Sequence, residues 1–437
     1  MHRHFKKFRN RCLAVLCIGL SPAWADATRL LQLIDQALAG HPAVQSQRSL
    51  LGAAQESVRS ARWQYFPTPS VSVQSAQTSN ADPAYAGDAQ VAVLALTQPL
   101  WTGGRIQAGV DKAQANAQGA GAGLAEAQQQ LAIRVVQAYG DWLSAYRKRL
   151  AYQAGYAQHI RLKNQVSRRI QEGQAAASDL ACAQGRLASL EADLALAITQ
   201  EEVSLARLSQ LLGQPVLAKS LTQSLAQPLP VGPNVGELLA QAQRASPSLL
   251  RARSNAQVQQ AAIQEAQSAT LPEVAFRLEQ QFGNFSYAGG PAHTRGFISL
   301  SSKLGAGLSS FAAVNEAVQR HAAALTDIEA QQRNLFEQVM TDHALLVSSQ
   351  SRRQALQTSA DLADQVLASW DRQYLAGRKT WQDLMNSARE QVQAQAQLAD
   401  LDGSQLVASW RLALTTGQLE VPTGQSPMSG ASLAEQK

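Results

Sequence analysis

Aromatic residues, cysteines and long apolar runs are scarce in this sequence of 437 residues. Aromatics make up 5% of the chain and charged residues 16%, which suits helices packed side by side through Ala and Leu better than the compact cores of two or three ordinary domains. After residue 25 the only cysteine is Cys182, which excludes an internal disulfide and a cysteine-ligated zinc site. No later apolar run reaches about 20 residues, so no membrane-spanning helix is predicted there.

Sequence signatures of catalysis are missing as well. The histidines after residue 25 do not have the spacing of metal ligands; they are His41, His159, His293, His321 and His343. The chain contains neither a phosphate-binding loop nor the turn that carries a nucleophilic serine. We therefore predict no enzymatic activity, no cofactor and no metal, and we infer that any energy source must be a partner protein.

The first 25 residues have the three parts of a secretory signal peptide, although a cytoplasmic basic tail is the alternative. The basic residues come first and are Arg3, Lys6, Lys7, Arg9 and Arg11. A short apolar segment follows from Leu13 to Leu20, and Ala23-Trp24-Ala25 is a small-x-small cleavage site that leaves Asp26 as the mature start. Cys17 has no small residue before it, so a lipoprotein cleavage site is not predicted.

Removal of this segment changes the charge of the chain. Lys plus Arg falls from 38 to 33 while Asp plus Glu stays at 32, which leaves a net charge of +1. The high isoelectric point therefore belongs to the leader, and nucleic-acid binding is not predicted. Export leaves three locations, which are the periplasm, the outside, or an outer membrane entered through β-strands.

Two long blocks contain no proline, and they indicate an internal duplication. The first lies between Pro99 and Pro215, and the second runs from Ala292 to Val421. Both are rich in strong helix formers. Landmarks recur in the two halves at offsets of 204 or 205 residues, and they are Pro42 and Pro247, Pro67 and Pro272, Gly173 and Gly377, Asp179 and Asp383, and Gly213 and Gly417.

The duplication predicts two repeats with the same plan. The repeats span 26–213 and 234–421, with a linker over 214–233 and a flexible tail over 422–437. Each repeat begins with a helix that an early proline interrupts, over 28–65 and 235–269. A pair of strands follows at about 70–99 and 273–304, and then a long helical hairpin over 105–213 and 308–417 that stops at a glycine.

The predicted strands alternate in polarity, as strands do between lipid and a water-filled lumen. In the first repeat the alternating residues are Val71, Val73, Ser75 and Gln77, then Val91, Val93 and Ala95. In the second repeat Val274, Phe276, Leu278 and Phe282 face one way, and Arg277, Glu279 and Gln281 face the other. Segments of about 10 residues can cross a bilayer as tilted strands, but an ordinary half-buried hairpin fits the same pattern.

The number of strands requires more than one chain if they span a membrane. Single-chain barrels begin at about eight strands, and an open sheet edge is unstable in lipid. Aromatic residues gather at the strand ends, as in an interfacial girdle or in ordinary junction packing, and they are Trp63, Tyr65, Phe66, Trp101, Phe285, Tyr287 and Phe311. Membrane insertion would thus force oligomerisation.

Residues 105–172 predict one continuous helix on the order of 100 Å long, at about 1.5 Å per residue. Its apolar residues form two adjacent stripes. One stripe contains Leu131, Val135, Ala138, Trp142, Ala145, Tyr152 and Tyr156, and the other contains Ala132, Val136, Tyr139, Leu143, Tyr146, Leu150 and Ala157. Two stripes predict neighbours on both sides, as in a ring or sheet of helices, whereas one broad core-facing side in a bundle is the alternative.

The chain resembles the TolC-type outer-membrane factor family over nearly its whole mature length. The resemblance lies in the duplicated order, the motif Gln98-Pro99-Leu100-Trp101-Thr102-Gly103-Gly104, and a Gly-(five residues)-Asp-Leu hairpin in both repeats. In the second repeat the first motif is reduced to Ser302-Lys303-Leu304-Gly305-Ala306-Gly307. The resemblance implies a mainly α fold with a small β part, in which a trimeric α-helical periplasmic tunnel continues into a shared twelve-stranded transmembrane β-barrel with four strands per chain.

The resemblance also implies a function and partners. The protein would be a channel in the outer membrane that extends into the periplasm and exports proteins, drugs or other small molecules. The chain would form a homotrimer. Its implied partners are a periplasmic adaptor (membrane fusion) protein, an inner-membrane ABC or proton-driven transporter, and outer-membrane lipid. Type I protein secretion and multidrug efflux both fit this description.

By the same resemblance, the functional residues fall into two regions. The periplasmic tip and gate would contain Gly173, Asp179, Tyr374, Gly377, Lys379 and Asp383, with Tyr374 at a latch tyrosine and Lys379 where the family can carry an arginine. The barrel–helix junction would contain Pro99, Trp101, Gly103 and Gly104. In a threefold ring each tip carboxylate would occur three times near the axis, which favours cations. Thr380-x-x-Asp383 also fits a capping box, so Asp383 has a structural alternative.

Two other interpretations compete with the channel. A soluble periplasmic coiled-coil scaffold would need no detergent and would form no heat-resistant membrane oligomer. A periplasmic adaptor would carry one helical hairpin between extended β-domains, whereas this sequence predicts two hairpins and four short strands. The channel is therefore the favoured prediction.

Overall fold

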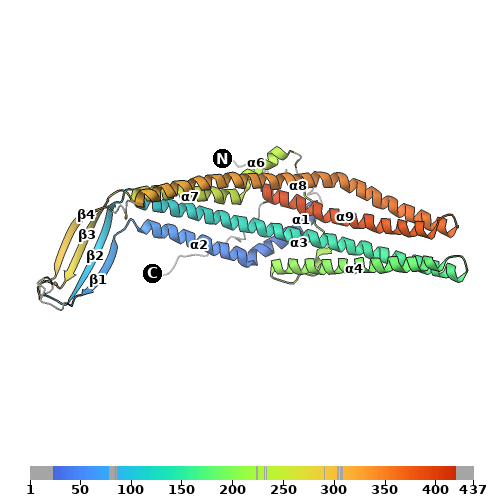
Figure 1. The fold of residues 1–437 in the computed structure, drawn as a ribbon, viewed down its shortest axis with the longest axis horizontal. Coiled ribbons are helices and arrows are strands. Elements are labelled where there is room, and N and C mark those ends of the chain that lie inside the picture. The colour runs from blue at the N-terminus through green and yellow to red at the C-terminus, as the bar shows by residue number, and fades with distance from the viewer. Residues whose placement is uncertain are drawn as a thin grey trace, which may run out of the picture.

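The protein is a long rod with strands at one end and two helical hairpin ends at the other (Figure 1). This computed structural model describes residues 23–419 except 78–83, 85, 223–224, 231, 233, 290, 303–304 and 306–308. Residues 1–22 of the predicted leader, the predicted tail over 422–437, and parts of the 214–233 linker and the 302–307 motif lie outside the described residues.

The elements repeat in the same order in the two halves. The first half contains α1 (Ala23–Gly40), α2 (Pro42–Trp63), β1 (Thr68–Ser75), β2 (Gln90–Trp101), α3 (Arg105–Gln171) and α4 (Ala177–Leu212). After the short α5 (Ala218–Thr222), the second half contains α6 (Val235–Ala245), α7 (Pro247–Ser268), β3 (Glu273–Phe282), β4 (His293–Ser301), α8 (Ser309–Leu375) and α9 (Trp381–Thr416).

Corresponding helices have equal lengths. Helices α3 and α8 have 67 residues each, α4 and α9 have 36 each, and α2 and α7 have 22 each. The long helices run the length of the rod; α2 and α7 accompany their strand-side parts, and α4 and α9 accompany the other parts (Figure 1). Contacts of α3 with α7 and α9 join the two halves side by side.

The helix breaks follow from proline and glycine chemistry. Pro42 and Pro247 begin α2 and α7, where a missing backbone N–H costs nothing. The residues before them cap these helices: His41 Nδ1 accepts from the Ala43 amide at 3.2 Å, and Ser246 Oγ accepts from the Leu249 amide at 3.3 Å. The interruption predicted at both prolines is therefore confirmed.

The four strands form one antiparallel sheet in the order β1-β2-β3-β4. The register places one set of uncharged residues on one face, and its large apolar members include Val71, Val73, Leu94, Leu96, Phe276, Leu278, Phe282, Ile298 and Leu300. All nine are exposed. Every charged side chain of the described strands lies on the opposite face, because Glu273, Arg277, Glu279 and Arg295 all have the alternate parity. The sheet therefore has one uncharged, mainly apolar face and one polar face that carries the strand charges and also exposes Phe297.

The pairing of β2 decides an orientation that the predicted alternation left open. Val91, Val93 and Ala95 alternate as expected, but they are paired with Gln281 and Glu279 in the register and so share the polar face. The apolar face of β2 is supplied by Leu94 and Leu96. Alternation alone cannot decide this, since β2 carries apolar residues at both parities and only its pairing with β3 fixes the orientation.

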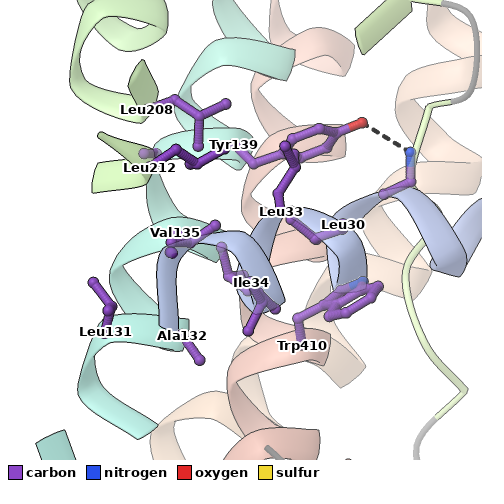
Figure 2. Packing of buried hydrophobic residues seen from close by; sticks show 14 of the residues in the cluster. Leu30, Leu33, Ile34, Leu131, Ala132, Val135, Tyr139, Leu208, Leu212 and Trp410 are labelled. Atoms are coloured by element: carbon purple, nitrogen blue, oxygen red, sulfur yellow. Dashed lines mark hydrogen bonds between the residues drawn. The ribbon is translucent and has the colours of Figure 1, made fainter. Parts of the chain in front are cut away.

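The main core lies in the middle of the rod, where α1 packs against α3, α4 and α9 (Figure 2). Leu30 and Ile34 of α1 meet Val135 and Tyr139 of α3, with Trp410 of α9 on the other side. These side chains are almost fully buried. A core of this kind fixes α9 to α3 halfway along the rod.

The segment after α4 is attached to this core. The Ala226 amide donates to Tyr139 Oη at 2.9 Å (Figure 2), and Trp410 Nε1 donates to the Gln227 carbonyl at 3.0 Å. The Leu229 amide donates to Ser409 Oγ at 3.1 Å. The described part of the predicted 214–233 linker is thus packed onto α3 and α9.

The two apolar stripes of α3 do have neighbours on both sides. Helices α4 and α9 both contact α3 and hardly contact each other. Both stripes are buried from Leu131 to Ala145. Beyond that point Leu150 and Ala157 are exposed, so the second stripe is covered over a shorter length than predicted.

Candidate functional site

The two hairpin ends, residues 171–177 and 375–381, lie side by side at the end of the rod remote from the sheet (Figure 1). Gly173 and Gly377 have φ of 72° and 71°. In each hairpin the amide after the glycine bonds five residues back, from Gln174 to the Arg169 carbonyl and from Arg378 to the Gln373 carbonyl, both at 2.8 Å. This αL termination needs a residue without Cβ, so both predicted glycines lie at the chain reversals.

The second hairpin end has a complete capping box at the start of α9. The Asp383 amide donates to Thr380 Oγ1 at 3.2 Å, and the Thr380 amide donates to Asp383 Oδ2 at 3.3 Å. These hydrogen bonds lower the pKa of Asp383. The capping role considered for Asp383 is therefore confirmed, while a gating role stays a prediction.

An arginine from the first hairpin contacts the predicted latch tyrosine of the second. The Arg169 guanidinium lies 4.8 Å from the centre of the Tyr374 ring, and its Nη1 donates to the Tyr374 carbonyl at 2.9 Å. The Tyr374 ring also packs against Trp381, with 5.3 Å between ring centres. Burial raises the pKa of the Tyr374 hydroxyl, with a further rise from Asp179 that Arg169 opposes. The hydroxyl therefore stays neutral.

Lys379 contacts a different aromatic ring. Its ammonium lies 4.2 Å from the centre of the Trp370 ring, a cation–π contact within the second hairpin. The cation that joins the two hairpins near their ends is therefore Arg169, which was not among the predicted tip residues. Its position near the end of α3 was the available signal, because a basic residue there faces the neighbouring hairpin once the ends lie side by side.

A groove of about 480 Å³ separates the two hairpin ends. It brings together Asp179, Tyr374, Gly377 and Lys379 from the predicted set and adds Arg169 and Trp381. The remaining two, Gly173 and Asp383, are not among its described lining residues. The indole N–H of Trp381 is buried and has no hydrogen-bond acceptor within the described part of the chain. The groove therefore combines cationic, acidic and aromatic side chains from both hairpins.

The predicted junction residues lie where β2 turns into α3. The pairing of β2 with β3 shifts between Pro99 and Trp101, as expected where proline removes a ladder hydrogen bond. Gly103 and Gly104 follow with φ of 60° and 92°, and a Cβ on Gly103 would lie 2.9 Å from Leu271 Cβ. Trp101 is exposed. These four residues make the sharp turn between sheet and rod.

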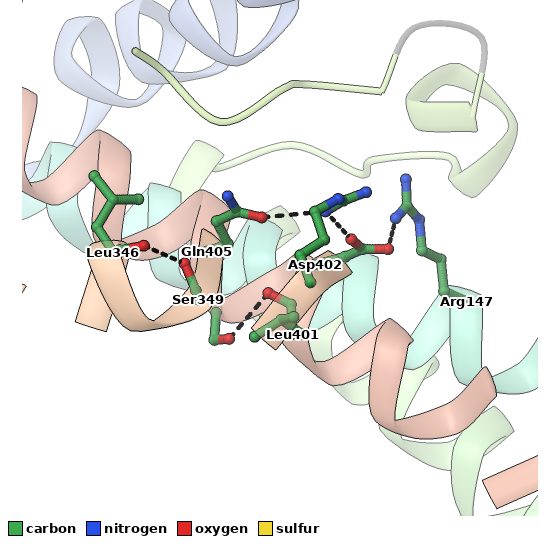
Figure 3. Close-up of polar contacts among 8 residues, drawn as sticks. Arg147, Leu346, Ser349, Leu401, Asp402 and Gln405 are labelled. Atoms are coloured by element: carbon green, nitrogen blue, oxygen red, sulfur yellow. Dashed lines mark hydrogen bonds and ion pairs between the residues drawn. The ribbon is translucent and has the colours of Figure 1, made fainter. Parts of the chain in front are cut away.

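A buried carboxylate ties three helices together between the core and the hairpin ends (Figure 3). Asp402 of α9 forms ion pairs with Arg147 of α3 and Arg353 of α8, and Arg353 also donates to Gln405 at 3.1 Å. Nearby, the α3 and α9 backbones approach closely, since a Cβ on Gly140 would lie 2.2 Å from Val407 Cγ2. The two hairpins are thus locked at this level, whereas Arg169 and Tyr374 join them near the ends.

Metal chemistry finds no support in the described residues. They contain no group of three or more His, Cys, Asp or Glu side chains that could hold a metal ion. Within the same part of the chain, no helix is long and apolar enough to span a bilayer.

The fold is that of outer-membrane channels. The outer-membrane channel OprN shares it with a TM-score of 0.78 at 21% identity, covering 92% of each chain. The outer membrane protein VceC of Vibrio cholerae aligns with a TM-score of 0.77 at 18% identity, over 91% of this chain and 98% of its own. The open-state MtrE outer membrane channel of Neisseria gonorrhoeae aligns with a TM-score of 0.73 at 18% identity, over 89% of each chain. No curated sequence relative is matched.

A family model described as "Outer membrane efflux protein" matches residues 33–214 and 238–418. Because these segments make up most of the chain, the protein belongs to the outer membrane efflux protein family. The predicted TolC-type membership, the mainly α fold with a four-stranded sheet, and the outer-membrane location with a helical part in the periplasm are confirmed. Members of this family are trimeric channels that work with adaptors and inner-membrane transporters.

Proposed function

We propose that this chain forms a homotrimeric outer-membrane channel of a tripartite exporter. It receives substrates from an inner-membrane transporter and a periplasmic adaptor and releases them outside the cell. The observation that carries the proposal is the sheet, whose uncharged face exposes nine large apolar side chains while all strand charges lie on the other face. Lipid on one side and water on the other accounts for this division.

The open edges of the sheet support assembly from three chains. Strands β1 and β4 each pair on one side only, and unpaired strand edges are costly in a bilayer. Pairing β4 of one chain with β1 of the next closes a twelve-stranded barrel from three copies and leaves no edge.

Exposed apolar residues on the flanking helices support the same assembly. On α8 they include Phe336, Met340, Leu345 and Val347, and on α4 they include Leu196 and Val203. A monomer would leave these patches in water, whereas a ring would bury the α8 flank of one chain against the opposite flank of the next. The soluble scaffold does not account for the apolar sheet face.

The hairpin ends support a gate. Arg169 crosses from the first hairpin to Tyr374 of the second, and this contact holds the two ends at a fixed spacing. We expect Arg169→Ala to open the channel more than the pair Tyr374→Phe with Lys379→Ala, because Lys379 contacts Trp370 within its own hairpin.

Single-channel recording tests the channel and the gate together. Full-length protein is reconstituted into planar bilayers, and the conductance of Arg169→Ala is compared with that of wild type and of Arg169→Lys, which keeps the charge. We expect the largest conductance for Arg169→Ala. Equal conductance in all variants would refute the gate, and a water-soluble monomer without conductance would refute the channel.

Small-molecule efflux is the use that the family description supports, with type I protein secretion as the second candidate. A photo-crosslinking residue at Gln382, which is exposed and lines the groove, should capture a periplasmic adaptor. A crosslinker at Gln45, an exposed residue at the start of α2 beside the main core in the middle of the rod, is the control. The co-purified transporter decides between an ABC and a proton-driven partner, and capture of neither at Gln382 would contradict the tripartite assembly.

A further inference from the structure

The charges on the polar face of the sheet form one cluster near its outer loops. Glu279 of β3 lies between two arginines, with 3.2 Å to Arg277 Nε and 2.9 Å to Arg295 Nη2. Arg295 Nη2 also donates to Gln281 Oε1 at 2.5 Å. The register pairs Glu279 with Arg295 across β3 and β4, and Arg277 follows two residues away along β3, opposite Phe297.

The cluster carries one more positive than negative charge. The carboxylate of Glu279 is covered, with 11% of its side chain exposed, whereas 42% of Arg277 and 56% of Arg295 are exposed. An ion approaching this face therefore meets guanidinium groups, not the carboxylate. One arginine is matched by Glu279 and the other is in excess.

Two other acidic residues lie near this sheet, and of these only Glu273 forms an ion pair within the described residues, whereas Asp88 keeps its negative charge in the loop region. Glu273, at the opposite end of β3, pairs with Arg105 of α3 at 2.6 Å. In the loops beyond the strands, Asp88 accepts from the amides of Asn284 at 2.8 Å and Gly289 at 3.3 Å. The excess positive charge among the described strand residues thus lies at the level of Arg277 and Arg295.

We propose that this cluster lines the outer exit of the channel as a ring that favours anions. The inference rests on the proposed function, because only a closed barrel turns the polar face into a lumen. Three copies of the cluster give a ring with an excess of positive charge, and rings of arginine are the usual lining of anion-conducting pores. The carboxylates at the hairpin ends are predicted to favour cations, whereas this ring would favour anions. The two ends of the channel would therefore select for ions of opposite charge.

The expected size of the effect follows from Coulomb's law. At about 10 Å in water, one unit charge changes the local concentration of a monovalent ion roughly twofold. Screening removes most of this at about 1 M salt, where the Debye length is about 3 Å, but little at about 0.01 M, where it is about 30 Å. An electrostatic role therefore predicts a selectivity that depends on salt.

Reversal potentials in a KCl gradient test the ring. Full-length protein is recorded in planar bilayers in the wild-type background and in the Arg169→Ala background. The second background is needed because closed hairpin ends would limit the current and mask the ion selectivity of the outer exit. We expect the double variant Arg277→Gln with Arg295→Gln to lower the chloride-to-potassium permeability ratio several-fold at low salt. Glu279→Gln should raise the ratio, and Arg295→Lys should leave it near the wild-type value.

Opposite shifts from the arginine and glutamate variants, shrinking at high salt, would support the proposal, since a purely structural role does not reverse sign with charge. If all variants conduct with the same chloride-to-potassium permeability ratio, the anion ring is refuted and the proposed channel is not. Absence of conductance in every background would overturn the channel and the ring together.

Discussion

The α3–α4 and α8–α9 hairpins have helices of equal length but opposite patterns of burial. In the first hairpin the long helix α3 is covered by neighbours, while the shorter α4 is largely exposed. In the second the shorter helix α9 is the covered one, and most of α8 is exposed. Duplication supplied two copies of one hairpin, and side-by-side packing in one chain gave each copy one inner and one outer helix.

Residues at equivalent positions of the two hairpins differ in burial in the same way. Gly140 of α3 packs against α9, and its counterpart 204 residues later is the exposed Ala344. Asp402 of α9 is buried between arginines, and its counterpart is the exposed Ile198 of α4. The hairpin ends differ as well, since Thr380 caps α9 through its side chain while Ala176 has no side chain that could cap α4.

The largest expected effect comes from enlarging the residue at the α3–α9 crossing. Gly140→Val should destabilise the protein by about 3 kcal/mol or more, because a new Cβ would meet Val407 Cγ2 at 2.2 Å and the Gly403 carbonyl at 3.2 Å. Urea unfolding of the detergent-solubilised protein measures it. The matched control is Ala344→Val, which should cost less than about 1 kcal/mol. Equal losses at the two positions would contradict the assignment of inner and outer helices.

A smaller loss is expected from the carboxylate that joins the two hairpins. Asp402→Asn should cost about 2 kcal/mol, which is below the usual cost of breaking a buried ion pair because Arg147 and Arg353 are partly exposed and can be hydrated. The same urea titration applies. Asp400→Asn is the control, since Asp400 pairs with Lys148 while 54% exposed and should contribute under about 1 kcal/mol. If Asp402→Asn lost less stability than the control, the ion pairs of Asp402 would not be what holds the two hairpins together.

The difference between the hairpin ends can be reversed by two single substitutions. Thr380→Ala removes the cap of α9 and should cost about 1 kcal/mol of local stability. Ala176→Thr places a threonine three residues before Asp179 and should create the same capping box on α4, with a gain of similar or smaller size. Amide hydrogen exchange in the first turns of α4 and α9 measures both. Slower exchange in α4 after Ala176→Thr is the decisive observation.

The smallest expected effect depends on pH and occurs in one hairpin only. Burial lowers the pKa of His159 below its ordinary value of 6.5, against the Gly155 hydrogen bond that raises it, and Arg186 lowers it further. The folded protein therefore binds this proton less readily than the unfolded chain, so stability is full above about pH 6.5 and falls as the pH drops toward the lowered pKa. The counterpart of His159 is Ala363.

Unfolding free energies at about pH 7.5 and about pH 5 check this prediction. His159→Gln removes the titrating group and should reduce the difference between the two pH values. An unchanged difference in His159→Gln would assign the pH dependence to other groups.

The elements and their order follow from residues that are close together in the chain. Proline placed the breaks before α2 and α7, glycine placed the reversals at Gly173 and Gly377, and the recurring offsets disclosed the duplication, because these effects act within a few residues of the chain. The polarity of β3 likewise predicted its two faces. Each of these depends on local backbone chemistry or on a periodicity that one segment contains in full.

Which elements become neighbours depends instead on the tertiary structure. It turned Val91 and Val93 to the polar face, chose Arg169 and not Lys379 as the contact of Tyr374, and brought Arg147, Arg353 and Asp402 together from three helices. Contacts between segments far apart in sequence depend on register and on the crossing of whole helices, and no local pattern encodes that relative placement.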